Sequence, residues 1–234
     1  MFFTVRLKKI IIAALLVIAV IICALLFLKQ GDAKAVSTAA PAVLVIDPGH
    51  GGIDGGAIAG DGTKESGINL AISLKMKAVA ELYGVKTVMT RDSEESRVSV
   101  KEYSERADLL RRADIANTTP GCVLISVHQN KFPTASPTGA QVLYASGDGS
   151  RELGLSAQDC LVSFADPDNR RVAAPAPSKL LLTASVSCPA ILAECGFMSN
   201  PGEVQKLSSP EYQLKIACAL TAAYITFSIN YAQT

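Results

Sequence analysis

Three apolar runs constrain the possible fold of this chain most. Each of them leads to a side chain that can bind a metal or transfer a proton. The runs and the residues that follow them are Val43–Ile46 with His50, Cys122–Val127 with His128, and Pro189–Ala193 with Glu194. Apolar runs of this length, rich in β-branched residues and without polar alternation, are typical of strands buried on both faces of a parallel sheet. Open α/β sheets bind their ligands beyond the carboxyl ends of such strands. We therefore expect the three side chains to meet at one edge of a sheet.

The chain contains 2 histidines, and both belong to this set. A lone histidine after a strand is more often a packing or capping residue. Two histidines at matching positions, with a glutamate at a third, favour a functional site. Two neutral imidazoles and one carboxylate bind zinc tetrahedrally and leave the fourth position for water. A second carboxylate, not bound to the metal, can move the proton of that water to a leaving amine.

Spacing alone leaves the third metal ligand open among four acids, which are Asp54, Asp61, Glu65 and Glu194. The first three lie in a long glycine-rich loop, residues 51–67, and loops of this length in compact domains are usually functional. Asp47 precedes a proline. It either caps a turn or orients His50 by a hydrogen bond without binding the metal itself.

Cysteine chemistry is the competing interpretation of the third run. Cys195 follows Glu194 directly, but a nucleophilic cysteine would leave the paired histidines unexplained. The chain has 6 cysteines and no CxxC pair, and Cys23 lies in the apolar N-terminal part. The others stand in or beside predicted strands and helices, at Cys122, Cys160, Cys188, Cys195 and Cys218. This distribution favours small buried side chains over a disulfide framework.

Strand and helix patterns alternate along the rest of the chain, which predicts an α/β fold with a mainly parallel sheet. Further strands are expected at residues 85–90, 139–145 and 179–182, and residues 166–178 form an irregular surface loop. Helices are expected at residues 72–83, 99–117, 150–165 and 209–230, and a short helix is expected to begin at Asn200. Most charges of the helix at 99–117 are expected to form a solvated face. The net charge of +1 gives no basic surface for nucleic acid.

The N-terminal part differs in composition from the rest. Ile10–Leu28 is continuously apolar, close to the length of about 20 residues that spans a bilayer, and Arg6, Lys8 and Lys9 precede it. The length favours an uncleaved anchor over a removed signal peptide, whose apolar core is about 7–15 residues. The chain therefore divides into an N-terminal membrane anchor or signal segment (1–28), a linker (29–41) and a catalytic domain (42–234). That domain is expected to be extracytoplasmic.

Four motifs, in this order, resemble those of the zinc-dependent N-acetylmuramoyl-L-alanine amidases: residues 47–52 (DPGHGG), 64–65 (KE), 126–130 (SVHQN) and 193–200 (AECGFMSN). The resemblance covers about Val43 to Tyr231. It implies that His50, Glu65 and His128 bind Zn²⁺ and that Glu194 is the catalytic acid/base. It also implies a single domain with about six mostly parallel strands between helices, and a peptidoglycan substrate. The bond cut is the amide between N-acetylmuramic acid and L-alanine.

Within that family the chain looks most like the spore-cortex and germination-specific amidases of endospore-forming bacteria. That likeness implies trimming of stem peptides so that muramic-δ-lactam can form. An activating protein partner, of unknown identity, is compatible with it. The alternatives are a zinc peptidase that cuts within the stem peptide and a non-catalytic peptidoglycan-binding protein on the same fold. Arg91 and Arg112 either order loops, contact substrate carboxylates or form structural ion pairs.

Overall fold

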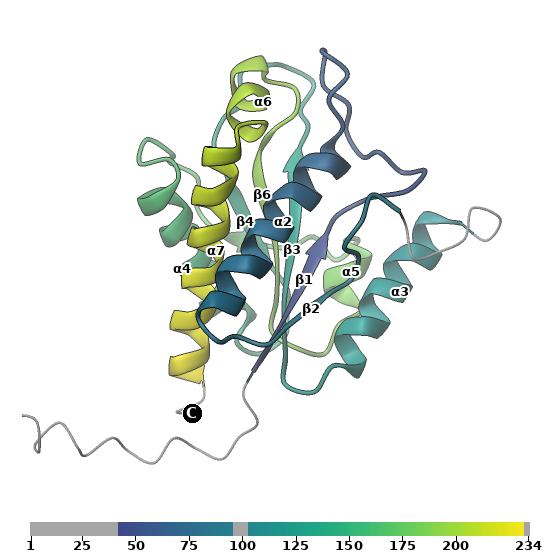
Figure 1. Ribbon diagram of the computed structural model, residues 1–234, viewed down its shortest axis with the longest axis vertical. Helices are drawn as coiled ribbons and strands as arrows, with labels where there is room; N and C mark the ends of the chain where they lie inside the picture. Colours follow the sequence, from purple (N-terminus) through teal and green to yellow (C-terminus); the bar gives the residue numbers. More distant parts are fainter. Residues whose placement is uncertain (1–41, 96–102, 232–234) are drawn as a thin grey trace, which may run out of the picture. The chain divides into compact units, whose positions relative to one another are not determined.

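A six-stranded sheet lies at the centre of the computed structural model, which describes residues 42–95 and 103–231 (Figure 1). In chain order the strands are β1 (Val43–Pro48), β2 (Thr87–Met89), β3 (Cys122–Asn130), β4 (Gln141–Tyr144), β5 (Ala174–Pro175) and β6 (Ala190–Phe197). Their order across the sheet is β2-β1-β3-β6-β4-β5. The first four of these are mutually parallel, and β4 is antiparallel to β6. The predicted α/β fold with a mostly parallel sheet of about six strands is confirmed.

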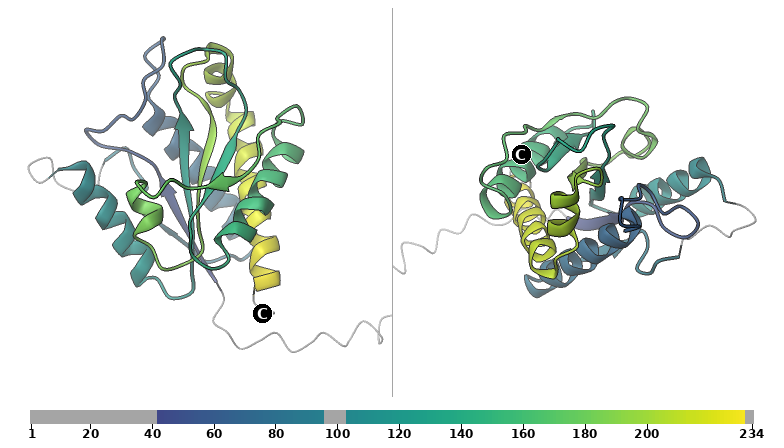
Figure 2. Two further views of the ribbon diagram at one scale, coloured as in Figure 1. Left: turned by 180° about the vertical axis from the view of Figure 1, so that it is seen from behind. Right: turned by 90° about the horizontal axis from the view of Figure 1, so that it is seen from above.

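Helices cover both faces of this sheet (Figures 1 and 2). One face carries α2 (Glu65–Leu82), α4 (Ser150–Phe164) and α7 (Pro210–Tyr231), and the other carries α3 (Glu105–Thr118) and α5 (Leu181–Ala184). The short α6 (Pro201–Leu207) comes directly before α7. The side chain of Asn200 caps α6 by accepting hydrogen bonds from the Gly202 and Glu203 N–H groups of that helix, as expected from an Asn–Pro helix start.

Successive residues of the central strands enter two different cores. In β1, Leu44 and Ile46 pack toward α2 and α7, whereas Val45 packs toward α3 and α5. In β3, Leu124 shares the second core with Val45. Side chains alternate between the faces of a strand, so a strand covered by helices on both faces must be apolar at every position. This explains why the central runs show no polar alternation.

Two predictions about the chain before β6 were wrong. The segment 179–182 was expected to be a strand, but residues 181–184 form the single turn α5, in which the Ala184 N–H bonds to the Leu180 carbonyl. The strand lies earlier, at Ala174–Pro175, inside the segment expected to be irregular. Short apolar runs do not distinguish a strand from a helical turn. A proline is tolerated in β5 because the strand is at the sheet edge.

Two helix starts also differ from expectation. The glycine-rich segment ends at Lys64, and Glu65 is already the first residue of α2. The helix predicted from residue 99 begins at Glu105, where Ser104 caps it by accepting from the Ala107 N–H, and residues 96–102 lie outside the described part.

The predicted N-terminal anchor or signal segment (1–28) and linker (29–41) also lie outside the described residues. Within residues 42–95 and 103–231, no helix combines the length and the apolar character that crossing a membrane requires.

Candidate metal centre and active site

The carboxyl ends of β1, β3 and β6 bring three of the predicted side chains to one edge of the sheet. His50 follows β1, which is paired with β3 in parallel register up to Pro48 opposite Val127. His128 lies in β3 directly opposite Glu194 in β6. Parallel strands in register end at the same side of the sheet, so the three side chains converge there.

Glu65 joins this group from the first turn of α2. Its Oε1 lies 3.3 Å from Nε2 of His50 and 3.1 Å from Nδ1 of His128. The ligand atoms of these three residues all lie within 4.8 Å of one another. Tetrahedral zinc with bonds of about 2.0–2.1 Å separates its donors by about 3.3 Å. The set therefore fits a tetrahedral metal with an N₂O donor group.

The turn that carries His50 has an unusual backbone. Within the described residues, His50 alone of the non-glycine residues has a positive φ, at 60°. Gly49 precedes it, and a Cβ atom there would lie 2.2 Å from Nε2 of His128. Glycine is required at this position because the imidazole of His128 packs against the backbone.

The other acids proposed as third ligand occupy different places. Asp54 Oδ2 lies 2.7 Å from Nδ1 of His50, on the opposite side of the ring from Glu65. The Asp54 carboxylate also accepts a hydrogen bond from the Gly56 N–H. Such a carboxylate fixes the tautomer of a ligand histidine and directs Nε2 toward the metal. Asp61 is exposed and accepts from the Thr63 N–H in its own turn.

Besides its contacts with the two histidines, the Glu65 carboxylate accepts three hydrogen bonds. The Ala57 N–H donates to Oε2, and the Gln129 N–H and Asn69 Nδ2 donate to Oε1. The Gln129 side chain in turn donates to Asn69 Oδ1. Sequence reasoning missed Asn69, although a polar residue four positions after a candidate ligand on a helix lies on the same face.

Charge interactions at the site are strong. Burial lowers the pKa of His50, but the carboxylates of Glu65 and Asp54 outweigh burial and raise it to about 9. Burial raises the pKa of Glu65, but hydrogen bonds and charge interactions with both imidazoles hold it far below its ordinary value. Glu65 is therefore ionised at neutral pH, as a metal ligand must be.

Glu194 lies beside this group and outside it. Burial, together with the negative charge of Glu65, raises the pKa of the Glu194 carboxyl, although the two histidines oppose the shift. Its Oε2 is buried and has no hydrogen-bond partner among the described residues. A carboxyl with a raised pKa and a free oxygen suits proton transfer.

Asp47, Arg91 and Arg112 form hydrogen bonds that hold the turn carrying His50. Asp47 does not contact His50; its carboxylate accepts hydrogen bonds from Ser126, Thr90 and Arg112. Arg91 donates to the Pro48 and Gly49 carbonyls. Both arginines are nearly fully buried, with 1% and 4% of their surface exposed. Their contacts identify them as residues that order the turn.

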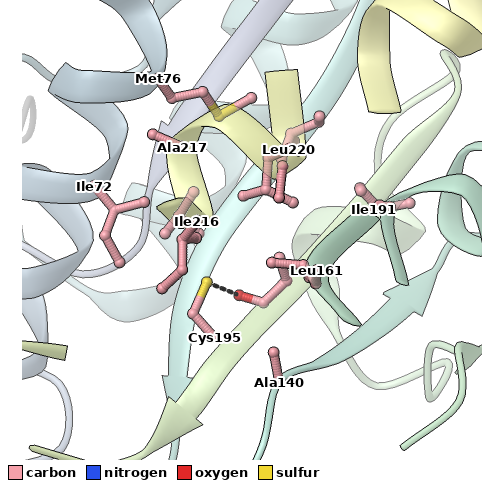
Figure 3. Close-up of a cluster of buried hydrophobic side chains, with 14 of the residues drawn as sticks. Ile72, Met76, Ala140, Leu161, Ile191, Cys195, Ile216, Ala217 and Leu220 are labelled. Atoms are coloured by element: carbon pink, nitrogen blue, oxygen red, sulfur yellow. Dashed lines mark hydrogen bonds between the residues drawn. The ribbon is translucent and has the colours of Figure 1, made fainter. Parts of the chain in front are cut away.

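Cys195 points away from the centre, into the core between the sheet and α7 (Figure 3). It is fully buried, and its thiol contacts the Ala193 carbonyl at 3.5 Å. Burial, followed by the neighbouring charge of Glu194, raises the pKa of the thiol beyond the range of a reactive cysteine. The nucleophile interpretation of Cys195 is wrong for this fold.

A cavity of about 220 Å³ opens onto the site from the side of α3 and α5. Both histidines and Glu194 line it, together with residues of α3 and α5 that include the apolar Leu109 and Leu182 and the charged Glu105 and Asp108. A second and more open cavity, of about 380 Å³, lies near Ser66 and Gln213 and includes neither histidine. The first cavity is therefore where a substrate can reach Glu194 and the two histidines.

Comparison with known proteins identifies the fold and motifs as those of one family. The family model described as N-acetylmuramoyl-L-alanine amidase matches residues 44–225.

Individual relatives agree with this match. A germination-specific N-acetylmuramoyl-L-alanine amidase of Bacillus subtilis is 32% identical over 183 residues, which are 76% of each chain. The CwlD amidase of Clostridioides difficile, solved in complex with the GerS lipoprotein, is 33% identical with a TM-score of 0.74, covering 80% of this chain and 98% of the other. The amidase AmiC2 of Nostoc punctiforme is 28% identical with a TM-score of 0.69, covering 84% and 99%.

Proposed function

This chain belongs to the N-acetylmuramoyl-L-alanine amidase family, and from that membership we propose a complete account of its site and its biological role. The enzyme hydrolyses the amide bond between N-acetylmuramic acid and L-alanine in peptidoglycan. Its substrate lies in the cell wall, so it acts outside the cytoplasm.

The proposed cofactor is Zn²⁺, held by His50, Glu65 and His128. One carboxylate and two imidazoles, with the carboxylate ionised and two donor separations close to those of a tetrahedron, support this assignment. Bound zinc supplies a Lewis acid for the scissile carbonyl and lowers the pKa of water. Asp54 keeps Nδ1 of His50 protonated, so that Nε2 remains a donor to the metal.

Glu194 is the proposed acid/base. Its carboxylate takes a proton from the attacking water, and the resulting carboxylic acid gives that proton to the nitrogen of L-alanine as the carbon–nitrogen bond breaks. The raised pKa favours the second half of this transfer, because an ordinary glutamate holds its proton too weakly at neutral pH. The juxtaposition of this free buried carboxyl with the three-ligand group is the observation that carries the proposal.

The proposed biological role is trimming of stem peptides in the spore cortex, which allows muramic-δ-lactam to form. The germination-specific name of the Bacillus subtilis relative supports it. The N-terminal segment, residues 1–28, is proposed as a membrane anchor with a linker at 29–41 and the catalytic domain at 42–234. Because the Clostridioides difficile relative was solved with a lipoprotein, an activating protein partner is also proposed.

Digestion of purified muropeptides by the full chain tests the reaction. We expect peptide-free muramic acid and stem peptides with free L-alanine amino termini, identified by mass spectrometry. Chelator should stop the reaction and zinc should restore it. Cleavage within the stem peptide would instead identify a zinc peptidase, and binding without cleavage a non-catalytic wall protein.

Substitution of the proposed acid/base tests the site. Glu194→Gln should lower kcat by about 10²–10⁴-fold while the protein still binds one equivalent of zinc. Glu152→Gln is the matched control, because Glu152 is an exposed acid on α4. Full activity of the Glu194 variant would contradict the assignment.

A further inference from the structure

Two of the cysteines expected to be independent buried thiols lie in contact. The sulfur atoms of Cys122 and Cys188 are 2.8 Å apart. All five described cysteines are free thiols in this structure. A disulfide has a sulfur–sulfur bond of about 2.05 Å, so bond formation needs a movement of less than about 1 Å. We propose that Cys122 and Cys188 form a disulfide bond in the mature protein.

The strand register explains why the two thiols meet. Leu124 of β3 is paired with Ala190 of β6, and the Leu124 N–H bonds to the Pro189 carbonyl. Extending this register back by two residues sets Cys122 opposite Cys188. Neighbouring strands are about 4.8 Å apart, which lies inside the Cα separation of about 4.4–6.8 Å that disulfides require. Both side chains project toward the core of α3 and α5.

Accessibility and acidity favour reaction at Cys188 first. Cys122 is 7% exposed, whereas Cys188 is only half-buried. The hydrogen bond between the two thiols outweighs burial and lowers the pKa of Cys188. The thiolate of Cys188 attacks a small disulfide such as oxidised glutathione and releases one thiolate. Cys122 then loses its proton, attacks the Cys188 sulfur of the mixed disulfide and releases the second thiolate. Two protein thiols and one small disulfide thus become one protein disulfide and two small thiols.

The bond would join the strands that carry His128 and Glu194, at the opposite end from the site. Each of these residues lies six positions after the corresponding cysteine, which is about 20 Å along a strand. At that distance the bond does not touch the reacting groups. It closes a loop between residues 66 positions apart, so its main effect is on the unfolded chain.

The proposal is independent of the catalytic assignment. An extracytoplasmic location provides a compartment in which disulfides persist. Bond formation is measured by alkylation of the cysteines, and the amidase reaction is measured by its products. Absence of the disulfide would therefore not argue against the amidase reaction, and absence of amidase activity would not argue against the disulfide.

Peptide mapping of the full chain in detergent tests the bond directly. After incubation with oxidised glutathione, unfolding in alkylating reagent and tryptic digestion, we expect residues 113–131 to be linked to residues 180–206. The second peptide also contains Cys195, which should carry the alkyl group. Recovery of both peptides unlinked, with Cys122 and Cys188 alkylated, would overturn the proposal.

Thermal unfolding with and without reductant gives a second readout. Oxidation should raise the Tm of the wild-type chain by roughly 5–15 °C and leave kcat within about twofold. Cys188→Ala, at the more exposed position, should abolish the shift. Cys160→Ala, at another half-buried cysteine, should retain it. A redox-dependent shift that survives in Cys188→Ala would place the reactive thiols elsewhere and refute the assignment.

Discussion

Arg112 offers the sharpest test of how the His50 turn is held. Its guanidinium donates to Asp108 Oδ2 at 2.6 Å, to Asp47 Oδ1 at 2.8 Å, and to the carbonyls of Pro48 and His50 at 2.7 and 2.6 Å. Arg112→Met keeps much of the side-chain volume and removes the charge and all four hydrogen bonds. It leaves the Asp47 carboxylate buried without its cation.

The expected loss of stability is large because both partners are buried. The Arg112 and Asp47 side chains are 5% and 1% exposed, so solvent screening is small. Removing one partner of a buried ion pair costs about 3–5 kcal/mol. For a domain of 150–250 residues, 1 kcal/mol shifts Tm by about 2–4 °C, so the expected fall in Tm is roughly 6–20 °C. Because the His50 carbonyl loses its donor, zinc affinity should fall by about 10–100-fold.

Arg111→Met is the matched control, one residue away on the same helix. Arg111 pairs with Asp114, and both side chains are more than half exposed, so its removal should change the unfolding free energy by less than about 0.5 kcal/mol. Urea and thermal unfolding of the metal-free chains measure stability, and zinc titration measures affinity. Adding Asp47→Asn to Arg112→Met should restore part of the stability, because it removes the buried negative charge of Asp47. The rescue is partial because Asp108 also loses its bond to Arg112 and keeps its charge.

The pH dependence of unfolding gives a further check with a defined sign. Burial raises the pKa of Asp47, but Arg112 and the Ser126 and Thr90 hydrogen bonds lower it below its unfolded value of about 4. This stabilisation is therefore present above about pH 4 and is lost as pH falls through the lower folded value. Arg112→Met removes the largest contribution that lowers the pKa of Asp47, so this pKa should rise in the variant. The loss of stability relative to the wild type should therefore be smaller at pH 4 than at pH 6. Equal stability and equal pH profiles for the Arg112 and Arg111 variants would refute this reasoning.

Two smaller predictions concern the metal ligands. Asp54→Asn removes the carboxylate that holds Nδ1 of His50, so zinc affinity in chelator competition should fall by about 10–100-fold with little change in the Tm of the metal-free protein. Gly49→Ala places a Cβ atom 2.2 Å from Nε2 of His128 and should displace that ring, which abolishes zinc binding in the same assay. Gly60→Ala, where an added Cβ meets nothing within 4 Å, should bind zinc as the wild type does.

The strands could be predicted because apolar residues fill every position of the central runs. The proposed ligand set could not be predicted from spacing, and only the family resemblance selected Glu65. Spacing left four acids open, and the places of three of them, Asp54, Asp61 and Glu65, depend on how residues 51–64 fold. In the structure that segment directs Asp54 to the far nitrogen of His50 and leaves Asp61 exposed. Glu65 reaches both imidazoles because α2 begins at that residue. The position of Glu65 beside the histidines thus depends on where α2 begins. Helix boundaries are the least reliable part of a pattern-based prediction.

Arg112 shows a second limit of sequence patterns. The helix that carries it was expected to present most of its charges to solvent, and nothing in its spacing separates Arg112 from Arg111. The difference comes from the turn at His50, whose positive φ and glycine neighbours leave buried carbonyls without strand partners. Buried carbonyls require donors, and a guanidinium supplies several in one plane. The cost of burying that cation is offset by Asp47, so a strained turn, an acid and an arginine 65 residues apart form one unit. His50, the proposed metal ligand on this turn, therefore depends on residues outside the proposed metal-binding group.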